Sequence, residues 1–172
     1  MLRAMVVLGL MLGAVVPAGA QSTVVVVVRH AEAGPAPAGD PVLTERGIQR
    51  AHALARALGG AEVAAVITTH YARTGQTGEP TATTTGAARH VVRVDRAAGE
   101  AHIGELVERI RREYAGRTVL VVGHSNTVPQ IIEALGGPAV PAIADSEHDR
   151  LYVLTLDEGG ARLVASRYGD GP

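Results

Sequence analysis

Arginine and histidine side chains are the residues of this sequence whose types and spacing point to chemistry. Arg29 and His30 are adjacent, Arg73 lies in a segment rich in Thr and Gly, and His124 is followed by Ser125. Two guanidinium groups bind a dianionic phosphoryl group through charge-assisted, bidentate hydrogen bonds. Nearby positive charge also disfavours imidazolium, which leaves a neutral ring nitrogen free to attack phosphorus. These residues predict phosphoryl transfer through a histidine, with Ser125 among the phosphate-binding groups.

Predicted β-strands bring these residues to one edge of a sheet. Residues 23–28, 63–67 and 118–122 are short apolar runs without polar alternation, which is typical of strands buried on both faces. In open α/β sheets the ligand lies beyond the carboxyl ends of the strands. We therefore expect the polar residues that follow the three runs to surround one crevice.

Helical patterns alternate with the strands. The expected helices are 44–58, with Thr44 as N-cap, 103–114, and a helix that Asn126 caps and that runs to Leu135. Residues 68–86 are expected to be loop and short helix, residues 90–94 a weaker strand, and residues 151–156 and 162–166 an antiparallel hairpin. This order predicts a single-domain α/β fold with three α/β/α layers, a mostly parallel central sheet and a terminal antiparallel hairpin.

Composition excludes several classes of protein. The chain has 172 residues with 16 Lys+Arg against 17 Asp+Glu, and this near-neutral balance gives no electrostatic footprint for nucleic acid. At 47% hydrophobic and 19% charged residues it is too apolar to stay disordered. The absence of Cys excludes a disulfide framework, a thiolate nucleophile and cysteine-based zinc sites.

The first twenty residues have the pattern of a secretory signal peptide. Arg3 precedes an apolar run over residues 4–16, and small residues end the segment at Ala20. The run is shorter than the roughly 20 residues that span a bilayer. We expect cleavage after Ala20, a mature catalytic domain over residues 21–172, a periplasmic or secreted location, and no stable membrane insertion after cleavage.

Four segments of this sequence resemble motifs of the histidine phosphatase superfamily and occur in the same order along the chain. The superfamily includes phosphoglycerate mutase-like enzymes and bacterial phosphohistidine phosphatases. The motifs are Val-Val-Arg-His-Ala-Glu (27–32), Leu-Thr-Glu-Arg-Gly-Ile-Gln-Arg-Ala (43–51), Thr-His-Tyr-Ala-Arg-Thr-Gly-Gln-Thr-Gly-Glu-Pro (69–80) and Val-Gly-His-Ser-Asn-Thr (122–127). The resemblance implies that His30 is the phosphorylated nucleophile and that Arg29 and Arg73 hold the phosphoryl oxygens. It further implies that His124 completes the pocket and stabilises the transition state.

No metal or other cofactor is expected. The resemblance implies none, and no two of the seven histidines have the i, i+4 spacing of a helical zinc face. The resemblance does imply a carboxylate, from the region after the third strand, that protonates the leaving oxygen. Glu100 is our choice, with Asp95 and His102 as alternatives. Glu100 equally fits an ordinary acidic residue that complements the dipole of the following helix.

Other polar residues are expected to lie in a loop or around the site. Residues 145–149 are expected to form a solvated loop, from which His148 and Asp149 are candidates to support His124. His70 and Tyr71 are candidates to line the mouth of the pocket.

The sequence as a whole predicts an exported, metal-independent phosphatase. It would hydrolyse a phosphomonoester or protein phosphohistidine through a covalent intermediate on His30, with a rate maximum at acidic to neutral pH. Two alternatives stay open: a non-catalytic phosphate or sugar-phosphate binding module on the same fold, and a phosphoglycerate mutase-like phosphotransferase. Residues 34–38 lack the polar side chain that often helps bind phosphate in the family, and this argues against the mutase.

Overall fold

Helices and strands alternate along the part of the chain that the computed structural model describes, residues 21–94 and 101–171. In chain order the elements are β1 (Thr23–Arg29), α1 (Glu45–Leu58), β2 (Val63–Thr69), α2 (Ala72–Thr85), β3 (Ala88–Val92), α3 (Ala101–Glu113), β4 (Thr118–Gly123), α4 (Thr127–Ala134), β5 (Arg150–Asp157) and β6 (Gly160–Arg167). The predicted α/β class is confirmed.

One mixed sheet joins the strands in the order β3-β2-β4-β1-β5-β6. The pairs β2–β3, β2–β4 and β1–β4 are parallel, and the pairs β1–β5 and β5–β6 are antiparallel. The mostly parallel sheet with a terminal antiparallel hairpin is therefore confirmed. The carboxyl ends of β1, β2 and β4 lie at the same edge of the sheet, as the site prediction requires.

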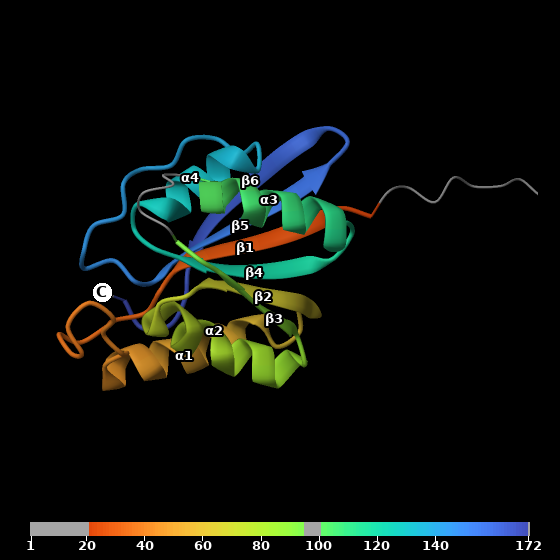
Figure 1. Cartoon of the computed structure of the whole chain (residues 1–172). Helices are drawn as coiled ribbons and strands as arrows, with labels where there is room; N and C mark the ends of the chain where they lie inside the picture. The colour runs from red at the N-terminus through yellow and green to blue at the C-terminus, as the bar shows by residue number, and fades with distance from the viewer. Residues whose placement is uncertain (1–20, 95–100, 172) are drawn as a thin grey trace, which may run out of the picture.

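Helices cover both faces of the sheet (Figure 1): α1 and α2 lie on one face, and α3 and α4 lie on the other. Alternate valines of β1 enter the two cores. Val25 and Val27 pack in the cluster that contains the buried residues of α3 and α4, whereas Val26 and Val28 pack in the cluster that contains Leu54 of α1. Burial on both faces explains why β1 is an uninterrupted run of β-branched residues.

Helix α1 begins directly against the segment that follows β1. Thr44 is its N-cap, as predicted, and its Oγ1 accepts a hydrogen bond from the Gly47 amide at 3.1 Å. A Cβ on Gly47 would lie 2.1 Å from the carbonyl oxygen of Glu32. Glycine at this position lets the helix approach the backbone two residues after His30.

Helix α2 differs from the prediction of loop and short helix, because it is a continuous helix of 14 residues. Threonine and glycine have low helix propensity, but here tertiary contacts outweigh it. The buried residues recur at i, i+3, i+4, i+7 and i+8, which is helical spacing built from small residues rather than aliphatic ones. A Cβ on Gly78 would lie 2.7 Å from Cγ1 of Val66, so the helix packs very close to the sheet. The buried positions are Thr74, Thr77, Gly78, Thr81 and Ala82.

Smaller differences occur at two element ends. Strand β3 spans Ala88–Val92 rather than 90–94. Asn126 precedes α4 as predicted, but its side chain makes no capping hydrogen bond. Instead Thr127 Oγ1 accepts a hydrogen bond from the backbone amide of His124 at 2.9 Å.

The predicted signal peptide, residues 1–20, lies outside the described residues. None of the helices in the described ranges is long and apolar enough to cross a membrane.

Candidate active site

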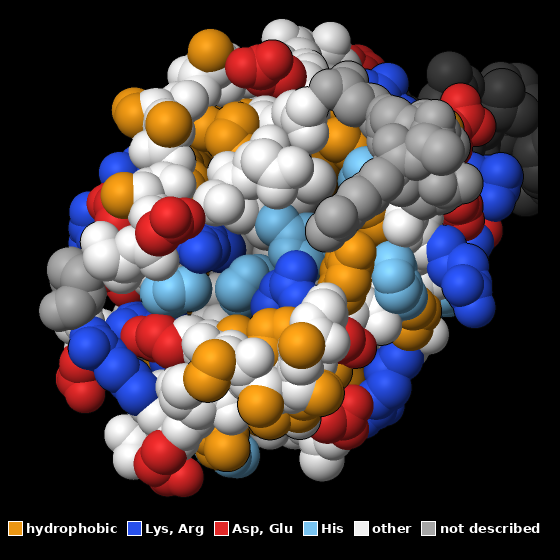
Figure 2. Space-filling view, turned by 60° about the vertical axis from the view of Figure 1, so that its left-hand side comes forward, with side chains coloured by type: hydrophobic (Ala, Val, Ile, Leu, Met, Phe, Trp, Pro, Cys, Tyr) orange, Lys and Arg blue, Asp and Glu red, His pale blue; other side chains and the backbone are white. Residues whose placement is uncertain are grey.

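Parallel pairing of β1 with β4 places the two principal histidines beside each other. Arg29 is paired with Gly123 in the register of the two strands. The His30 amide donates a hydrogen bond to the Gly123 carbonyl at 2.9 Å, and the ring centroids of His30 and His124 are 5.4 Å apart. Figure 2 shows histidine and arginine surfaces side by side in the middle of one face of the molecule.

The tautomer of His30 follows from its backbone contact. Nδ1 lies 2.8 Å from the carbonyl oxygen of Ala31, which can only accept, so Nδ1 carries the hydrogen. In the neutral ring Nε2 is then the nitrogen with a free lone pair. Burial lowers the pKa of His30 to about 3, and the charges of His124, Arg29 and Arg73 act in the same direction against the Ala31 hydrogen bond. His30 is therefore neutral, with Nε2 available as a nucleophile, over the physiological pH range.

Arg29 binds a loop through one nitrogen and keeps another donor unpaired. Nη1 donates hydrogen bonds to the carbonyl oxygens of Ala144, Asp145 and Glu147 at 2.8, 3.1 and 3.2 Å. Its Nε is buried and has no hydrogen-bond partner among the described residues. A buried guanidinium N–H without a partner is costly unless a ligand accepts from it. The side chain thus anchors the loop over residues 144–147 and retains a donor.

Arg73 comes from the first turn of α2. Its guanidinium lies 4.4 Å from the centroid of the Tyr71 ring, and Nη2 is 3.4 Å from Nδ1 of His124. Nη1 is 3.9 Å from Oδ1 of Asp40, which also accepts a hydrogen bond from the amide of Ala72 at 2.8 Å. The stacked ring and the carboxylate hold the Arg73 cation beside the two histidines.

His124 is a second buried neutral imidazole. Besides Arg73 at Nδ1, it contacts Thr69 Oγ1 through Nε2 at 3.1 Å. Burial lowers the pKa of His124 to about 4, followed in size by the charges of Arg73, Arg29, His102 and His70. A dianionic ligand between the arginines would oppose these effects and favour a protonated His124.

A hollow of about 260 Å³ opens between these side chains, which is enough for a phosphoryl group and a small part of what carries it. Four of the predicted site residues line it, namely His30, Arg73, His124 and Ser125, whereas Arg29 does not. Glu100 and Asp95 lie outside the described residues. His102, near the start of α3, is described, and its charge reaches His124. The lining residues are His30, Tyr71, Arg73, Val94, His124, Ser125, Asn126 and Thr127.

The proposed support of His124 by His148 or Asp149 is wrong. His148 Nδ1 donates to the carbonyl oxygen of His30 at 2.9 Å, and its ring centroid is 5.7 Å from that of His30. Asp149 accepts two hydrogen bonds from Nη1 of Arg167, both at 2.7 Å. The pairing of β1 with β5 places residue 148 beside His30 rather than beside β4.

Some residues of the site could not be found by residue type. Thr69 contacts His124 directly, and Thr74 is linked to it through the Thr69 hydroxyl. Both threonines belong to the motif over residues 69–80, which we identified by Arg73. Asp40 lies in a loop of Pro, Gly and Ala, where a single carboxylate next to a predicted arginine site is a weak signal.

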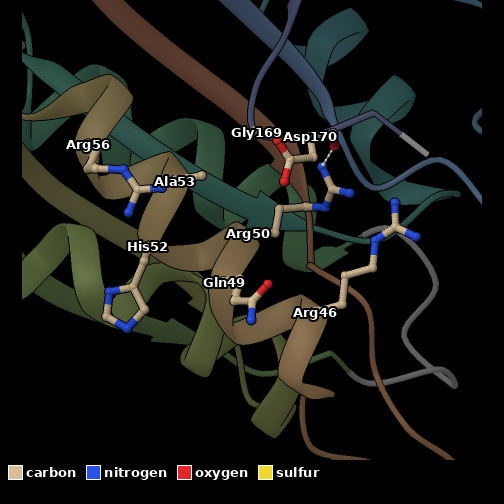
Figure 3. A pocket seen from close by; sticks show the side chains of 8 residues that line it. All are labelled: Arg46, Gln49, Arg50, His52, Ala53, Arg56, Gly169 and Asp170. Atoms are coloured by element: carbon tan, nitrogen blue, oxygen red, sulfur yellow. Dashed lines mark hydrogen bonds between the residues drawn. The ribbon is translucent and has the colours of Figure 1, made fainter.

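A second hollow, of about 410 Å³, lies on the exposed side of α1 (Figure 3) and holds the end of the chain rather than a catalytic cluster. Arg50 donates to both carboxylate oxygens of Glu32 and to the carbonyl oxygens of Tyr168 and Asp170. Arg46 also pairs with Glu32, at 3.1 Å. The donors of Arg50 are therefore occupied by Glu32 and by the end of the chain, and no pair of buried imidazoles lines this hollow.

Within residues 21–94 and 101–171, no group of three or more His, Asp or Glu side chains has an arrangement that could hold a metal ion.

Solved structures with this fold include several phosphatases. Bacillus stearothermophilus YhfR is 18% identical, with a TM-score of 0.65 over 84% of this chain and 96% of its own. The protein histidine phosphatase SixA in complex with tungstate is 22% identical, with a TM-score of 0.62 over the same shares. The mycobacterial glucosyl-3-phosphoglycerate phosphatase Rv2419c is 15% identical, with a TM-score of 0.58 over 86% of this chain and 99% of its own. Identities this low establish a shared fold only.

Sequence comparison points to the same group of proteins. No curated protein matches the sequence. Residues 25–106, which include the first three of the four motifs, match the model of the histidine phosphatase superfamily (branch 1). The matched segment and the shared fold confirm the predicted resemblance of this chain to the histidine phosphatase superfamily.

Proposed function

We propose that this protein is a phosphatase that works through a covalent phosphohistidine on Nε2 of His30. The observation that carries the proposal is the buried, neutral His30 ring, whose Nδ1–H is held by a carbonyl while Nε2 keeps its lone pair beside Arg73 and His124. A nucleophile with this protonation state needs no general base to activate it.

The proposed reaction has two steps. Nε2 of His30 attacks phosphorus, the bond to the leaving oxygen or nitrogen breaks, and a proton donor protonates the leaving group. Water then attacks the phosphohistidine, which releases inorganic phosphate and restores the neutral ring. In both steps Arg29 and Arg73 hold the phosphoryl oxygens, and His124 and Ser125 contribute hydrogen bonds to the same group. No metal ion takes part.

The proposed substrates are a small phosphomonoester or a phosphohistidine on a protein. The hollow is small, and within residues 21–94 and 101–171 no insertion lies over it that would exclude water between two transfers, which favours hydrolysis over mutase chemistry. Fold neighbours described as a protein histidine phosphatase and as a glucosyl-3-phosphoglycerate phosphatase support both classes equally.

The first experiment measures phosphate release from an aryl phosphate and from a phosphohistidine peptide in excess chelator. His30→Ala should abolish turnover, whereas His52→Ala, an exposed position on α1, should retain it. Acid-labile phosphate on the wild-type protein after rapid quenching would identify the intermediate. Binding of phosphate by His30→Ala without turnover of either substrate by the wild type would instead identify a binding module.

Glu100 is our proposed proton donor. Glu100→Gln should slow alkyl phosphate hydrolysis about 100-fold or more, but nitrophenyl phosphate much less, because a good leaving group needs little protonation. An equal loss on both esters would contradict this role. In that case the same comparison with Asp95→Asn and His102→Gln identifies the donor.

Export is the remaining part of the proposal. We propose that cleavage after Ala20 releases a periplasmic or secreted domain that begins at Gln21. The intact mass of the protein recovered from a secreting host tests this prediction, and a mass that includes residues 1–20 would contradict it.

A further inference from the structure

A chain of hydrogen bonds leads from His124 into the start of α2. His124 Nε2 is 3.1 Å from Thr69 Oγ1, which is 2.9 Å from Thr74 Oγ1. Thr74 Oγ1 lies 2.8 Å from the carbonyl oxygen of Tyr71 and 3.0 Å from that of Thr69. Thr74 is fully buried. The two hydroxyl groups therefore depend on each other and on these carbonyls.

The direction of each hydrogen bond follows from the groups at the two ends. Arg73 Nη2, 3.4 Å from His124 Nδ1, carries only hydrogens, so Nδ1 must accept. A neutral imidazole that accepts at Nδ1 carries its hydrogen on Nε2, which then donates to Thr69. Thr69 in turn donates to Thr74, and Thr74 donates to a backbone carbonyl, which can only accept.

The reverse direction is unfavourable at both ends of the chain. If Thr74 donated to Thr69, and Thr69 to Nε2, the hydrogen of His124 would lie on Nδ1 and point at the Arg73 guanidinium. The two carbonyl oxygens near Thr74 would then face its lone pairs instead of its hydrogen. Unsatisfied buried polar groups are costly, so the first direction holds.

We propose that Thr69 and Thr74 form a hydroxyl relay that positions His124 for catalysis by keeping its hydrogen on Nε2. Nδ1 then faces Arg73, and when a bound dianion favours protonation of His124, the added hydrogen lies on Nδ1 and is donated to the phosphoryl group. The inference rests on the proposed function, in which His124 acts on that group. Thr69 and Thr74 contact His124 and not the substrate, and they are therefore positioning residues.

The two histidines of the site thus have opposite tautomers, set in different ways. The hydrogen of His30 lies on Nδ1 because a backbone carbonyl accepts it. The hydrogen of His124 lies on Nε2 because a side-chain hydroxyl accepts it. Only the second arrangement can be removed by substitution without moving the backbone.

Three variants test the relay. Thr69→Val removes the hydroxyl with little change in shape, and Thr69→Ser keeps the hydroxyl while removing the methyl group. Thr81→Val is the matched control, because Thr81 lies fully buried on the same helix as Thr74 and its Oγ1 has no hydrogen-bond partner among the described residues. Each variant is assayed for aryl phosphate turnover, and ¹⁵N spectra of the labelled histidines report the His124 tautomer without substrate.

Thr69→Val should lower kcat about 10- to 100-fold with little change in KM, the usual range for losing a group that orients a catalytic imidazole. Its spectrum should show a mixture of His124 tautomers. Thr69→Ser and Thr81→Val should resemble the wild type in both readouts. A single Nε2–H tautomer in Thr69→Val, or a loss of kcat in Thr69→Ser as large as in Thr69→Val, would overturn the relay. If the wild type has no turnover, the proposed function fails, and the tautomer spectra alone decide on the relay.

Discussion

Arg29 and Arg73 are both guanidinium groups of the site, but they are not used in the same way. The Nη1 of Arg29 is occupied by three loop carbonyls, and Nε remains the buried donor. A lysine ammonium cannot satisfy both, because it is a point charge without a planar fork. Arg29→Lys should therefore lower kcat/KM about 10- to 100-fold, the cost of one or two charged hydrogen bonds. Steady-state kinetics of Arg29→Lys test this prediction, with Arg56→Lys, on the exposed face of α1, as the control. Full activity in Arg29→Lys would show that positive charge alone suffices at this position.

Residue type and place in the fold made the arginines and the two principal histidines predictable. Each lies at or shortly after the carboxyl end of a strand, which is where open α/β sheets bind their ligands. The same reasoning could not find Thr69 or the true contact of His148. A threonine hydroxyl or a loop imidazole gains its role from the atom that it faces. For Thr69 that depends on β2 lying beside β4, and for His148 on β5 lying beside β1. Periodicity alone does not determine which strands are adjacent.

At the scale of elements, the contact between α1 and the Glu32 backbone has a direct consequence for the site. In Gly47→Ala the new Cβ would collide with a carbonyl oxygen that cannot move without shifting the segment after His30. This variant should be less stable by more than about 1 kcal/mol and should turn over more slowly. Gly104→Ala is the matched control, because Gly104 lies on an exposed face of α3 with nothing within 4 Å of a new Cβ. It should gain about 0.5–1 kcal/mol. Urea unfolding and an activity assay separate the two variants, and equal behaviour would refute the close approach.

Strands β1, β2 and β4 could be predicted because burial on both faces leaves only apolar residues. Helix α2 could not be predicted with its full length, because its buried face is made of threonine and glycine. Thr77, for example, accepts a hydrogen bond from the Ala31 amide at 2.9 Å and donates to the Arg73 carbonyl at 2.7 Å. Such a residue is favourable in a helix only when its tertiary partner is present, and the sequence does not show that partner.

At the scale of the whole molecule, Arg50 connects the site segment to the end of the chain. It is buried, and its partners are Glu32 and the carbonyl oxygens of the tail after β6. Arg50→Met would leave Glu32 without its main partner, and we expect a loss of about 3 kcal/mol in the free energy of unfolding. Arg89→Met, which breaks an exposed pair with Glu79, should change stability little. Chemical denaturation compares the two variants, and a small effect of Arg50→Met would contradict the predicted contribution of Arg50 to stability.

Burying two neutral imidazoles makes the stability of the whole molecule depend on pH. The pKa values of His30 and His124 in the folded protein are about 3 and about 4, below the 6.5 of a free histidine. As pH falls below about 6.5 the unfolded chain takes up protons at both rings and the folded protein does not, so folding loses stability until the pH reaches the folded values. Between pH 7 and pH 5 each histidine should remove about 2 kcal/mol. Urea unfolding at these two pH values should therefore show a loss about 4 kcal/mol larger for the wild type than for the double variant His30→Gln, His124→Gln. Equal losses would mean that both rings are already protonated in the folded protein at pH 5, which would contradict the neutral nucleophile on which the proposed reaction depends.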